Sequence, residues 1–215
     1  MRRRALFSTL AMLISLCASV RADESPTSSG RLSPSETAFV KSIQADLPAR
    51  FAHAADAEKA GYVRYTNVDA SGAISYANMQ WTSQDIRHPS QLWYDKNGDL
   101  LGADFSVPNT DGKRPHLFGV SPGRWYAFED HVHYVLRDTT SGKMKYDLAV
   151  SPARFREAGG DPAHPTAATL VRMGKAKSES QVATVFDFPA IWDLIVWVKP
   201  NPDGAFAEKN PLVKS

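Results

Sequence analysis

The stretch Gln91–Pro108 reads Gln-Leu-Trp-Tyr-Asp-Lys-Asn-Gly-Asp-Leu-Leu-Gly-Ala-Asp-Phe-Ser-Val-Pro and predicts a β-hairpin at the centre of the fold. Asn97-Gly98 separates two apolar runs, and this dipeptide favours a type I′ turn, in which both central residues take a positive φ. Pro108 ends the second run, because proline has no N–H to donate to a sheet ladder. The stretch therefore predicts an antiparallel sheet built around a hairpin.

Two helices are predicted ahead of this sheet. Ser33-Pro34-Ser35-Glu36 combines a serine N-cap, a proline at the first helical position and a glutamate three residues after the cap, which together form a capping box. Apolar residues follow at helical spacing as far as Leu47, and Pro48 predicts a break. A second, alanine-rich helix is expected over 49–60, because Gly61 is a typical residue just after a helix end.

From residue 62 onward, apolar residues recur with a period of about 2, which indicates strands. A short helical insertion is expected near 151–174, starting at Ser151-Pro152 and closing at Gly174. The sequence thus predicts a single α+β domain over 32–215, with two N-terminal helices packed on a mainly antiparallel sheet or an open β-barrel. Residues 23–31 are polar and predict a flexible lead-in.

The first 22 residues have the organisation of a signal peptide. Arg2-Arg3-Arg4 precedes an apolar run over 5–20, and Val20-Arg21-Ala22 is a small-residue cleavage pattern. A short membrane anchor is the alternative, but a run of this length is marginal for a bilayer that needs about 20 residues. The general secretory and twin-arginine routes of export both stay open. We therefore expect a periplasmic or secreted protein with no membrane span after cleavage.

Composition excludes several classes of function. Removal of residues 1–22 takes away four arginines and changes the formal net charge from +2 to −2, which leaves no basic excess to attract nucleic acid. Cys17 is the only cysteine and is removed with this segment, so the mature chain has no disulfide and no cysteine nucleophile. Ser-x-x-Lys and glycine-rich phosphate loops are absent from the sequence, and the Gly-x-Ser-x-Gly spacing occurs only at Gly119-Val120-Ser121-Pro122-Gly123, which a predicted strand follows instead of the helix that this motif requires. No recognised catalytic motif therefore points to an enzyme.

The strongest candidate for chemistry is the stretch Glu129-Asp130-His131-Val132-His133. Alternate residues of a strand share a face, so Glu129, His131 and His133 are expected to point the same way. Two imidazoles and a carboxylate form the beginning of a zinc or non-haem iron site, which needs about three protein ligands. The alternative is a polar strand face in contact with water. No other cofactor is indicated.

Aromatic residues supply the candidates for a small-molecule pocket. Trp93, Trp125 and Trp192 lie in predicted strands and are the candidate ligand-lining residues. The alternative is that they belong to the core, where aromatic residues of strands usually pack.

The C-terminal stretch carries a resemblance to known proteins. Trp192–Pro211 combines an aromatic strand with Asn201-Pro202-Asp203-Gly204-Ala205-Phe206 and a second Asn-Pro pair. It resembles the ending of a family of exported, largely uncharacterised bacterial proteins. Shorter motifs occur in the same order as in that family: Gly61-Tyr62, Tyr76-Ala77-Asn78, Pro89-x-x-Leu92-x-Tyr94 and Leu117-Phe118-Gly119.

The resemblance implies export but no particular reaction. Members of the family often carry a histidine where this chain has Ser75 and Ile195, so no histidine role carries over to these positions. The Asn-Pro pairs have a structural interpretation, because an asparagine before proline is held extended and fixes where a strand stops. The sequence thus predicts an exported binding or structural module whose partner is a small molecule or an envelope component. A metal-binding protein or metal-dependent enzyme that uses His131 and His133 is the alternative.

Overall fold

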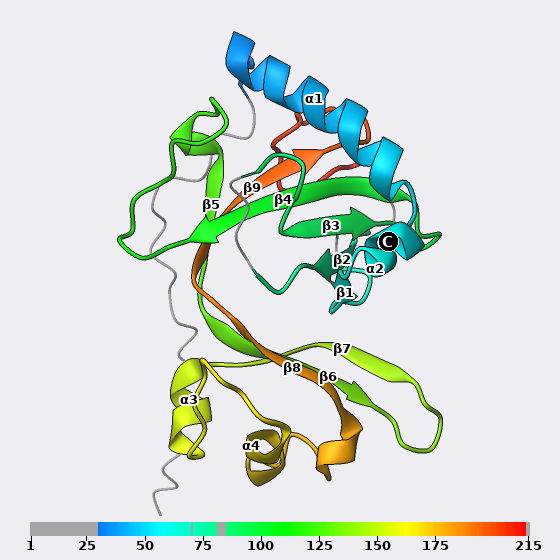
Figure 1. Cartoon of the computed structure of the whole chain (residues 1–215), viewed down its shortest axis with the longest axis vertical. Helices are drawn as coiled ribbons and strands as arrows, with labels where there is room; N and C mark the ends of the chain where they lie inside the picture. The colour runs from blue at the N-terminus through cyan, green and yellow to red at the C-terminus, as the bar shows by residue number, and fades with distance from the viewer. Residues whose placement is uncertain (1–29, 70, 81–84, 214–215) are drawn as a thin grey trace, which may run out of the picture.

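The computed structural model describes residues 30–69, 71–80 and 85–213, which form two open antiparallel sheets with helices packed on them (Figure 1). The predicted signal peptide and most of the predicted lead-in lie outside the described residues. The α+β class and the antiparallel sheet are confirmed, and the sheet does not close into a barrel. Within the described ranges, no helix has both the length and the apolar character needed to cross a membrane.

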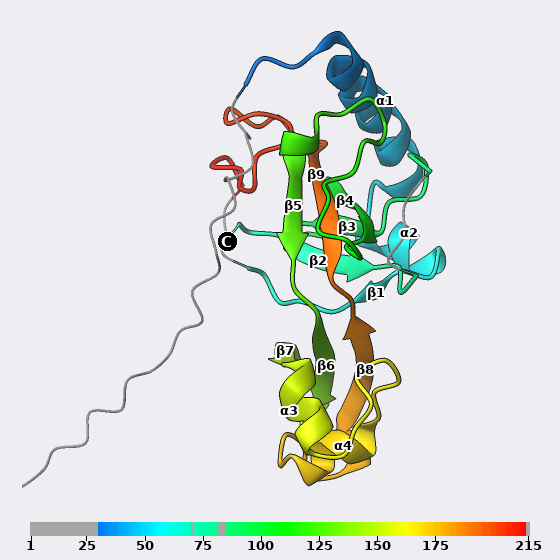
Figure 2. The same ribbon diagram turned by 90° about the vertical axis from the view of Figure 1, so that its left-hand side faces the viewer.

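The larger sheet has six strands in the order β1-β2-β3-β4-β9-β5, and all neighbouring strands are antiparallel. The long helix α1 (Pro34–Phe51) lies across one face of this sheet (Figures 1 and 2) and packs its apolar side into the main core. The strands are β1 (Val63–Arg64), β2 (Ile74–Ala77), β3 (Gln91–Tyr94), β4 (Leu100–Pro108), β5 (Trp125–Phe128) and β9 (Ile191–Trp197).

The smaller sheet has three strands in the order β7-β6-β8, and the helices α3 and α4 pack on one of its faces through Phe155 and Leu170. Only two residues separate β5 from β6 and β8 from β9, so two nearly continuous strands run from one sheet into the other (Figure 1). The bounds are β6 (His131–Arg137), β7 (Met144–Val150), β8 (Val182–Phe188), α3 (Pro152–Glu157) and α4 (Ala167–Arg172), with one-turn 3-10 helices at Pro122–Arg124 and Glu179–Gln181.

The segment after β9 folds back beside the sheet (Figure 2), and its buried Phe206 packs in the main core, with its ring centroid 6.4 Å from that of Phe39 on α1. The Asn201 side chain donates to the Lys209 carbonyl at 2.9 Å, and the Asn210 side chain donates to the Pro200 carbonyl at 2.9 Å. The buried Trp197 indole N–H donates to the Ala207 carbonyl at 2.6 Å. Both Asn-Pro asparagines therefore hold the fold of this segment through their side chains.

The break between the first two helices does not fall where the sequence predicts it. α1 continues through Pro48 to Phe51, and α2 (Ala54–Lys59) starts after the extended residue His53. The predicted break at Pro48 is therefore wrong, and the second helix starts five residues later than predicted, whereas its predicted end before Gly61 is confirmed. Backbone hydrogen bonds from the β3–β4 turn explain the observed break, because Leu100 N donates to the Ala52 carbonyl and Ala54 N donates to the Gly98 carbonyl.

The β3–β4 hairpin is confirmed, but its turn is not of type I′. Gly98 has a φ of +82°, whereas among the described non-glycine residues only Phe118 and Asp147 have a positive φ, so Asn97 does not. The Asp95 carboxylate accepts hydrogen bonds from the N–H groups of Asn97 and Asp99, and Gly98 N donates to the Asp95 carbonyl. This pattern is typical of a type I turn followed by a left-handed glycine.

The corrected turn predicts different effects of substitution at Gly98 and at Asn97. Gly98→Val should lower the free energy of unfolding by about 1 kcal/mol or more, because a β-branched residue resists a positive φ. Asn97→Ala should change it by less than about 0.5 kcal/mol, since the exposed Asn97 side chain bonds only within the turn. Urea denaturation measures both values, and equal losses at the two positions would support the type I′ assignment instead.

Candidate functional site

The face of the larger sheet that points away from α1 carries a group of buried polar side chains. Asp104 of β4 lies opposite Gln91 of β3 and Ile195 of β9, and Ser106 of β4 lies opposite Asp193 of β9. Side chains alternate between the two faces of a strand, so these residues share the face that α1 does not cover. Ser75 of β2, opposite Trp93, lies on the same face. The polar side chains of this face are all buried: Ser75, Gln91, Asp104, Ser106 and Asp193.

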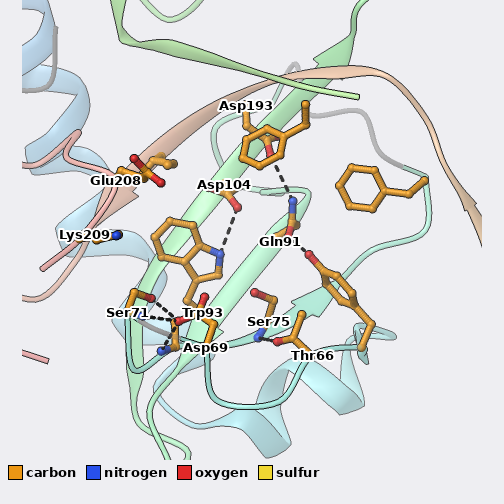
Figure 3. Close-up of a pocket in the computed structure, with 15 residues that line it drawn as sticks. Thr66, Asp69, Ser71, Ser75, Gln91, Trp93, Asp104, Asp193, Glu208 and Lys209 are labelled. Carbon is orange, nitrogen blue, oxygen red and sulfur yellow. Dashed lines mark hydrogen bonds between the residues drawn. The ribbon is translucent and has the colours of Figure 1, made fainter. Parts of the chain in front are cut away.

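Four of these polar side chains form the floor of a pocket of about 360 Å³ (Figure 3): Ser75, Gln91, Asp104 and Asp193. Four aromatic side chains line it, and the C-terminal segment contributes two charged residues at its rim, Glu208 and Lys209, both exposed. The β1–β2 connection contributes Asp69, whose carboxylate is engaged in its own turn with Ser71 and Ala73. The aromatic lining consists of Tyr65, Trp93, Phe128 and Phe188.

Asp104 is held from one side by Trp93. The Trp93 indole N–H donates to Asp104 Oδ2 at 3.0 Å (Figure 3). Gly102 lies opposite Trp93 in the register, and a Cβ atom at Gly102 would lie 3.3 Å from the Trp93 ring and 2.7 Å from the Val196 carbonyl oxygen. Gly102 has no side chain, so the Trp93 indole has room beside it in the position from which it donates to Asp104.

Asp193 is held by a short chain of hydrogen bonds. Gln91 Nε2 donates to Asp193 Oδ2 at 3.3 Å (Figure 3), and the Tyr65 hydroxyl donates to Gln91 Oε1. The amide of Gln91 is thus oriented by Tyr65, which fixes its N–H toward the carboxylate. The pocket floor therefore holds two separate sets of side-chain hydrogen bonds, one between Trp93 of β3 and Asp104 of β4 and one that joins Tyr65, Gln91 of β3 and Asp193 of β9.

One oxygen of each carboxyl group remains without a protein partner. Asp104 Oδ1 and Asp193 Oδ1 are buried and have no hydrogen-bond partner among the described residues. Burial raises the pKa of Asp104 well above its ordinary value, and the neighbouring Asp193 raises it further. Burial likewise raises the pKa of Asp193, to about 7. The two groups therefore hold protons at a pH at which exposed aspartates are ionised.

The electrostatic surroundings of the pair are acidic. Within the described residues, no lysine, arginine or histidine forms an ion pair with Asp104 or Asp193. Lys209 is the only basic residue that lines the pocket, and Glu208 lies beside it in the chain. The pocket thus presents two buried carboxyl groups on its floor, between flat apolar walls, and the described residues supply no cation that would favour their ionised forms.

The comparisons with known proteins give no family. No protein-family model matches the chain, and no curated protein or solved structure matches it significantly. The resemblance to exported bacterial proteins therefore stays a prediction from the sequence. What the site does must be argued from its own geometry.

The three candidate tryptophans have different places. Trp93 lines the pocket, 8% exposed. Trp125 and Trp192 belong to the main core under α1, and neither lines this pocket. The alternation of β5 and β9 explains the difference, because Leu194 and Trp192 point toward α1 whereas Asp193 points away from it.

The predicted metal strand is β6, and the structure brings only its two histidines together. The rings of His131 and His133 lie 5.7 Å apart on one face, stacked on Phe188 and Phe186 of β8. Glu129 is exposed and precedes the strand, and its backbone carbonyl accepts from His131 Nδ1 at 3.2 Å. In the described part of the chain, no three His, Cys, Asp or Glu side chains converge on a position suited to a metal ion. The structure therefore gives the predicted zinc or iron site no support.

The alternative prediction of a solvated strand face is wrong for His133. This side chain is 5% exposed, and its Nε2–H donates to the Tyr65 carbonyl at 3.1 Å, next to the pocket. Burial lowers the pKa of His133 to about 4, so the imidazole is neutral at neutral pH. Sequence periodicity placed His133 on the correct strand, but the partner that covers it comes from a segment 68 residues earlier in the chain.

His133 is expected to contribute to stability without binding a metal. His133→Phe keeps the ring on Phe186 but removes the 3.1 Å hydrogen bond to the Tyr65 carbonyl, which then keeps the longer 3.5 Å bond from Asp147 N, so the loss should be about 1 kcal/mol of the free energy of unfolding. His164→Ala is the matched control, because His164 is exposed and pairs only with Asp161, and it should cost less than about 0.5 kcal/mol. Near-stoichiometric zinc or iron in the purified protein, lost in His133→Phe, would contradict this account.

The sequence analysis missed the residues of the pocket floor. The available signal was the charge of Asp104 and Asp193, each of which interrupts an apolar run that reads as a central strand. Burial of an aspartate in such a strand is rare unless it is paired. A second signal lay in the resemblance, since Ser75 and Ile195, the two positions where the resembled family often has histidine, both line this pocket.

Proposed function

We propose that this protein is an exported binding module that holds a small organic molecule in the pocket on the uncovered face of the larger sheet. The observation that carries the proposal is the pair of buried carboxyl oxygens, Asp104 Oδ1 and Asp193 Oδ1, which lack a protein partner at the floor of an aromatic-walled pocket. Buried polar groups are nearly always satisfied, and a few convergent polar groups in an apolar pocket are the usual signature of a ligand site.

The network around the pocket supports binding by a preformed site. Trp93 is fixed by its bond to Asp104, and Gln91 is fixed between Tyr65 and Asp193. Because these side chains are already oriented, a ligand would pay little to order them. Export rests on the sequence of residues 1–22 and on the resemblance described above, and a small solute of the periplasm or the medium is the corresponding ligand.

Binding can be followed through Trp93. The purified mature chain should show a higher unfolding midpoint in the presence of a small organic ligand, because a ligand that binds only the folded state stabilises it. The same ligand should change the tryptophan emission, and the change should disappear in Trp93→Phe but persist in Trp125→Phe. Trp125 is fully buried in the main core and is the matched control.

Two results would contradict the proposal. An emission change that persists in Trp93→Phe would place binding elsewhere. Reproducible hydrolysis of generic esterase, phosphatase, peptidase or glycosidase substrates, lost in Asp104→Asn, would show that the carboxyl pair performs acid–base chemistry, for which raised pKa values are also suited.

A further inference from the structure

We infer that the ligand of this pocket is an organic cation whose charged group carries N–H donors, a primary ammonium or a guanidinium, bound by the free oxygens of Asp104 and Asp193. This inference rests on the proposed binding function and names the chemical class of the ligand. It is argued from the acceptors on the pocket floor, from the charges around them and from the pocket walls.

The pocket floor offers two carboxyl oxygens that no hydrogen bond of the described residues satisfies. Asp104 and Asp193 each use Oδ2 to accept from the protein, from Trp93 and from Gln91 respectively, and each keeps Oδ1 unpartnered. The raised pKa values keep these groups protonated without a ligand, but a bound cation favours their ionised forms, which only accept hydrogen bonds and therefore need a partner that supplies donors. A ligand group with at least two N–H donors would satisfy both oxygens, and a positive charge would make these hydrogen bonds stronger.

The second argument is charge. The floor holds two carboxyl groups, and no lysine, arginine or histidine of the described residues lies within ion-pair distance of either. Burying a carboxylate costs several kcal/mol unless it is paired, and a neutral or anionic ligand would leave that cost in place. A cation instead lets both groups ionise. The charge that the protein lacks at this position is therefore the charge expected on the ligand.

The third argument is the lining of the pocket. Trp93 and Phe188 present aromatic surface near the floor, and aromatic faces attract cations as well as flat apolar groups. A volume of about 360 Å³ suits a molecule with an amine at one end and a ring or short alkyl chain at the other. Lys209 at the rim is exposed, so it does not neutralise the floor.

Paired probes separate the charge of the ligand from its shape. The test compares tyramine with tyrosol and with hydroxyphenylpropionate, and cadaverine with pentanediol, so that only the terminal group changes. Isothermal titration calorimetry on the wild-type mature chain should give at least about tenfold tighter binding for an amine than for its matched alcohol or carboxylate. The N,N,N-trimethyl derivative of tyramine keeps the charge but has no N–H donor, and it should bind at least about tenfold more weakly than tyramine.

Variants assign the preference to the carboxyl pair. Asp104→Asn and Asp193→Asn should each weaken binding of the preferred amine by about 10- to 100-fold while leaving the weak binding of its alcohol unchanged. Asp187→Asn is the matched control, because Asp187 is a partly buried carboxyl on β8 whose pKa burial also raises, and it does not line the pocket. Its affinity for the amine should equal that of the wild type.

Affinity for the amine should also fall by at least about tenfold when the pH is lowered from 8 to 6, because protons then compete with the ligand for the carboxylates. The other titratable and charged groups that face the pair are Asp69 and Tyr65 from the β1–β2 connection and Glu208 and Lys209 from the C-terminal segment. His133 does not line the pocket and contacts Tyr65 through the Tyr65 carbonyl and through its ring, 5.1 Å away between centroids. The pH effect should therefore disappear in the Asp104→Asn/Asp193→Asn double variant.

The outcomes distinguish this inference from the proposed function. If an alcohol or carboxylate binds as tightly as its matched amine, with an emission change that depends on Trp93, the assignment of a cationic ligand is wrong and the binding function stands. If no probe binds the wild-type chain, both the assignment and the binding function fail. If amines bind equally well to wild type and to the asparagine variants, the carboxyl pair is not the site of recognition.

Discussion

Arg124→Ala should lower the free energy of unfolding by about 3–5 kcal/mol, the largest loss we expect from a single substitution in this chain. Arg124 Nε donates to Glu36 Oε1 at 3.1 Å, and the two side chains are only 6% and 4% exposed. Removing the cation leaves the Glu36 carboxylate buried without its partner, and that desolvation cost is not recovered. The link joins the first turn of α1 to the start of β5, so its loss weakens the attachment of α1 to the sheet.

The pKa of Glu36 supports this interpretation. Burial alone would raise its pKa, but hydrogen bonds from Arg124, Ser33 N and Ser121 N outweigh burial and hold the pKa below its ordinary value. Equilibrium urea denaturation at neutral pH measures the loss. Lys59→Ala is the matched control, since the Lys59–Asp56 pair is exposed and 3.8 Å long, and it should cost less than about 0.5 kcal/mol. A loss below about 1 kcal/mol in Arg124→Ala would show that this pair does not anchor α1.

The Asp104→Asn/Asp193→Asn double variant should be more stable than the wild type at pH 8, by about 2 to 4 kcal/mol, and close to the wild type at pH 4. The pKa values of both groups are raised in the folded protein, to about 7 for Asp193, above the ordinary value of 3.8. The folded state therefore holds more protons than the unfolded state between these values. Wild-type stability must fall as the pH rises through that window.

Comparison with the wild type isolates the carboxyl pair from other titrations. His133 acts in the opposite direction, because its pKa is lowered to about 4, so its contribution to stability is lost as the pH falls from about 6.5 toward 4. His133 is present in both proteins and cancels in the difference. Thermal or urea unfolding at a series of pH values gives the difference curve. A flat difference curve would mean that ionising Asp104 and Asp193 costs the folded protein little free energy. Burial would then not raise their pKa values.

Local sequence signals predicted the elements of this fold well where neighbouring residues decide the structure. The capping box of Ser33 and Glu36 is present as predicted, and the hairpin around Gly98 is present. The same signals failed where distant segments decide the structure. The helix break after Phe51 depends on hydrogen bonds from the β3–β4 turn, and the burial of Glu36 depends on Arg124, 88 residues away.

The site was less predictable than the fold for a related reason. Histidines at i and i+2 attract attention as metal ligands, but a metal site needs further ligands from other segments, and the described residues supply none near His131 and His133. Asp104 and Asp193 are 89 positions apart in the sequence, and only the β4–β9 register brings them to one face. The sequence shows that Asp104 and Asp193 lie within apolar strands. Only the order and register of the strands show that the two side chains are neighbours.

The most direct test of the carboxyl-pair site is a titration of the side-chain carboxyl carbons of Asp104 and Asp193 by 13C NMR, with and without saturating tyramine. The two asparagine variants assign the resonances. The account predicts that both groups titrate well above the ordinary aspartate range in the free protein and at clearly lower pH when tyramine is bound, because a bound cation favours their ionised forms. Titration of both groups near the ordinary range, unchanged by tyramine, would contradict it.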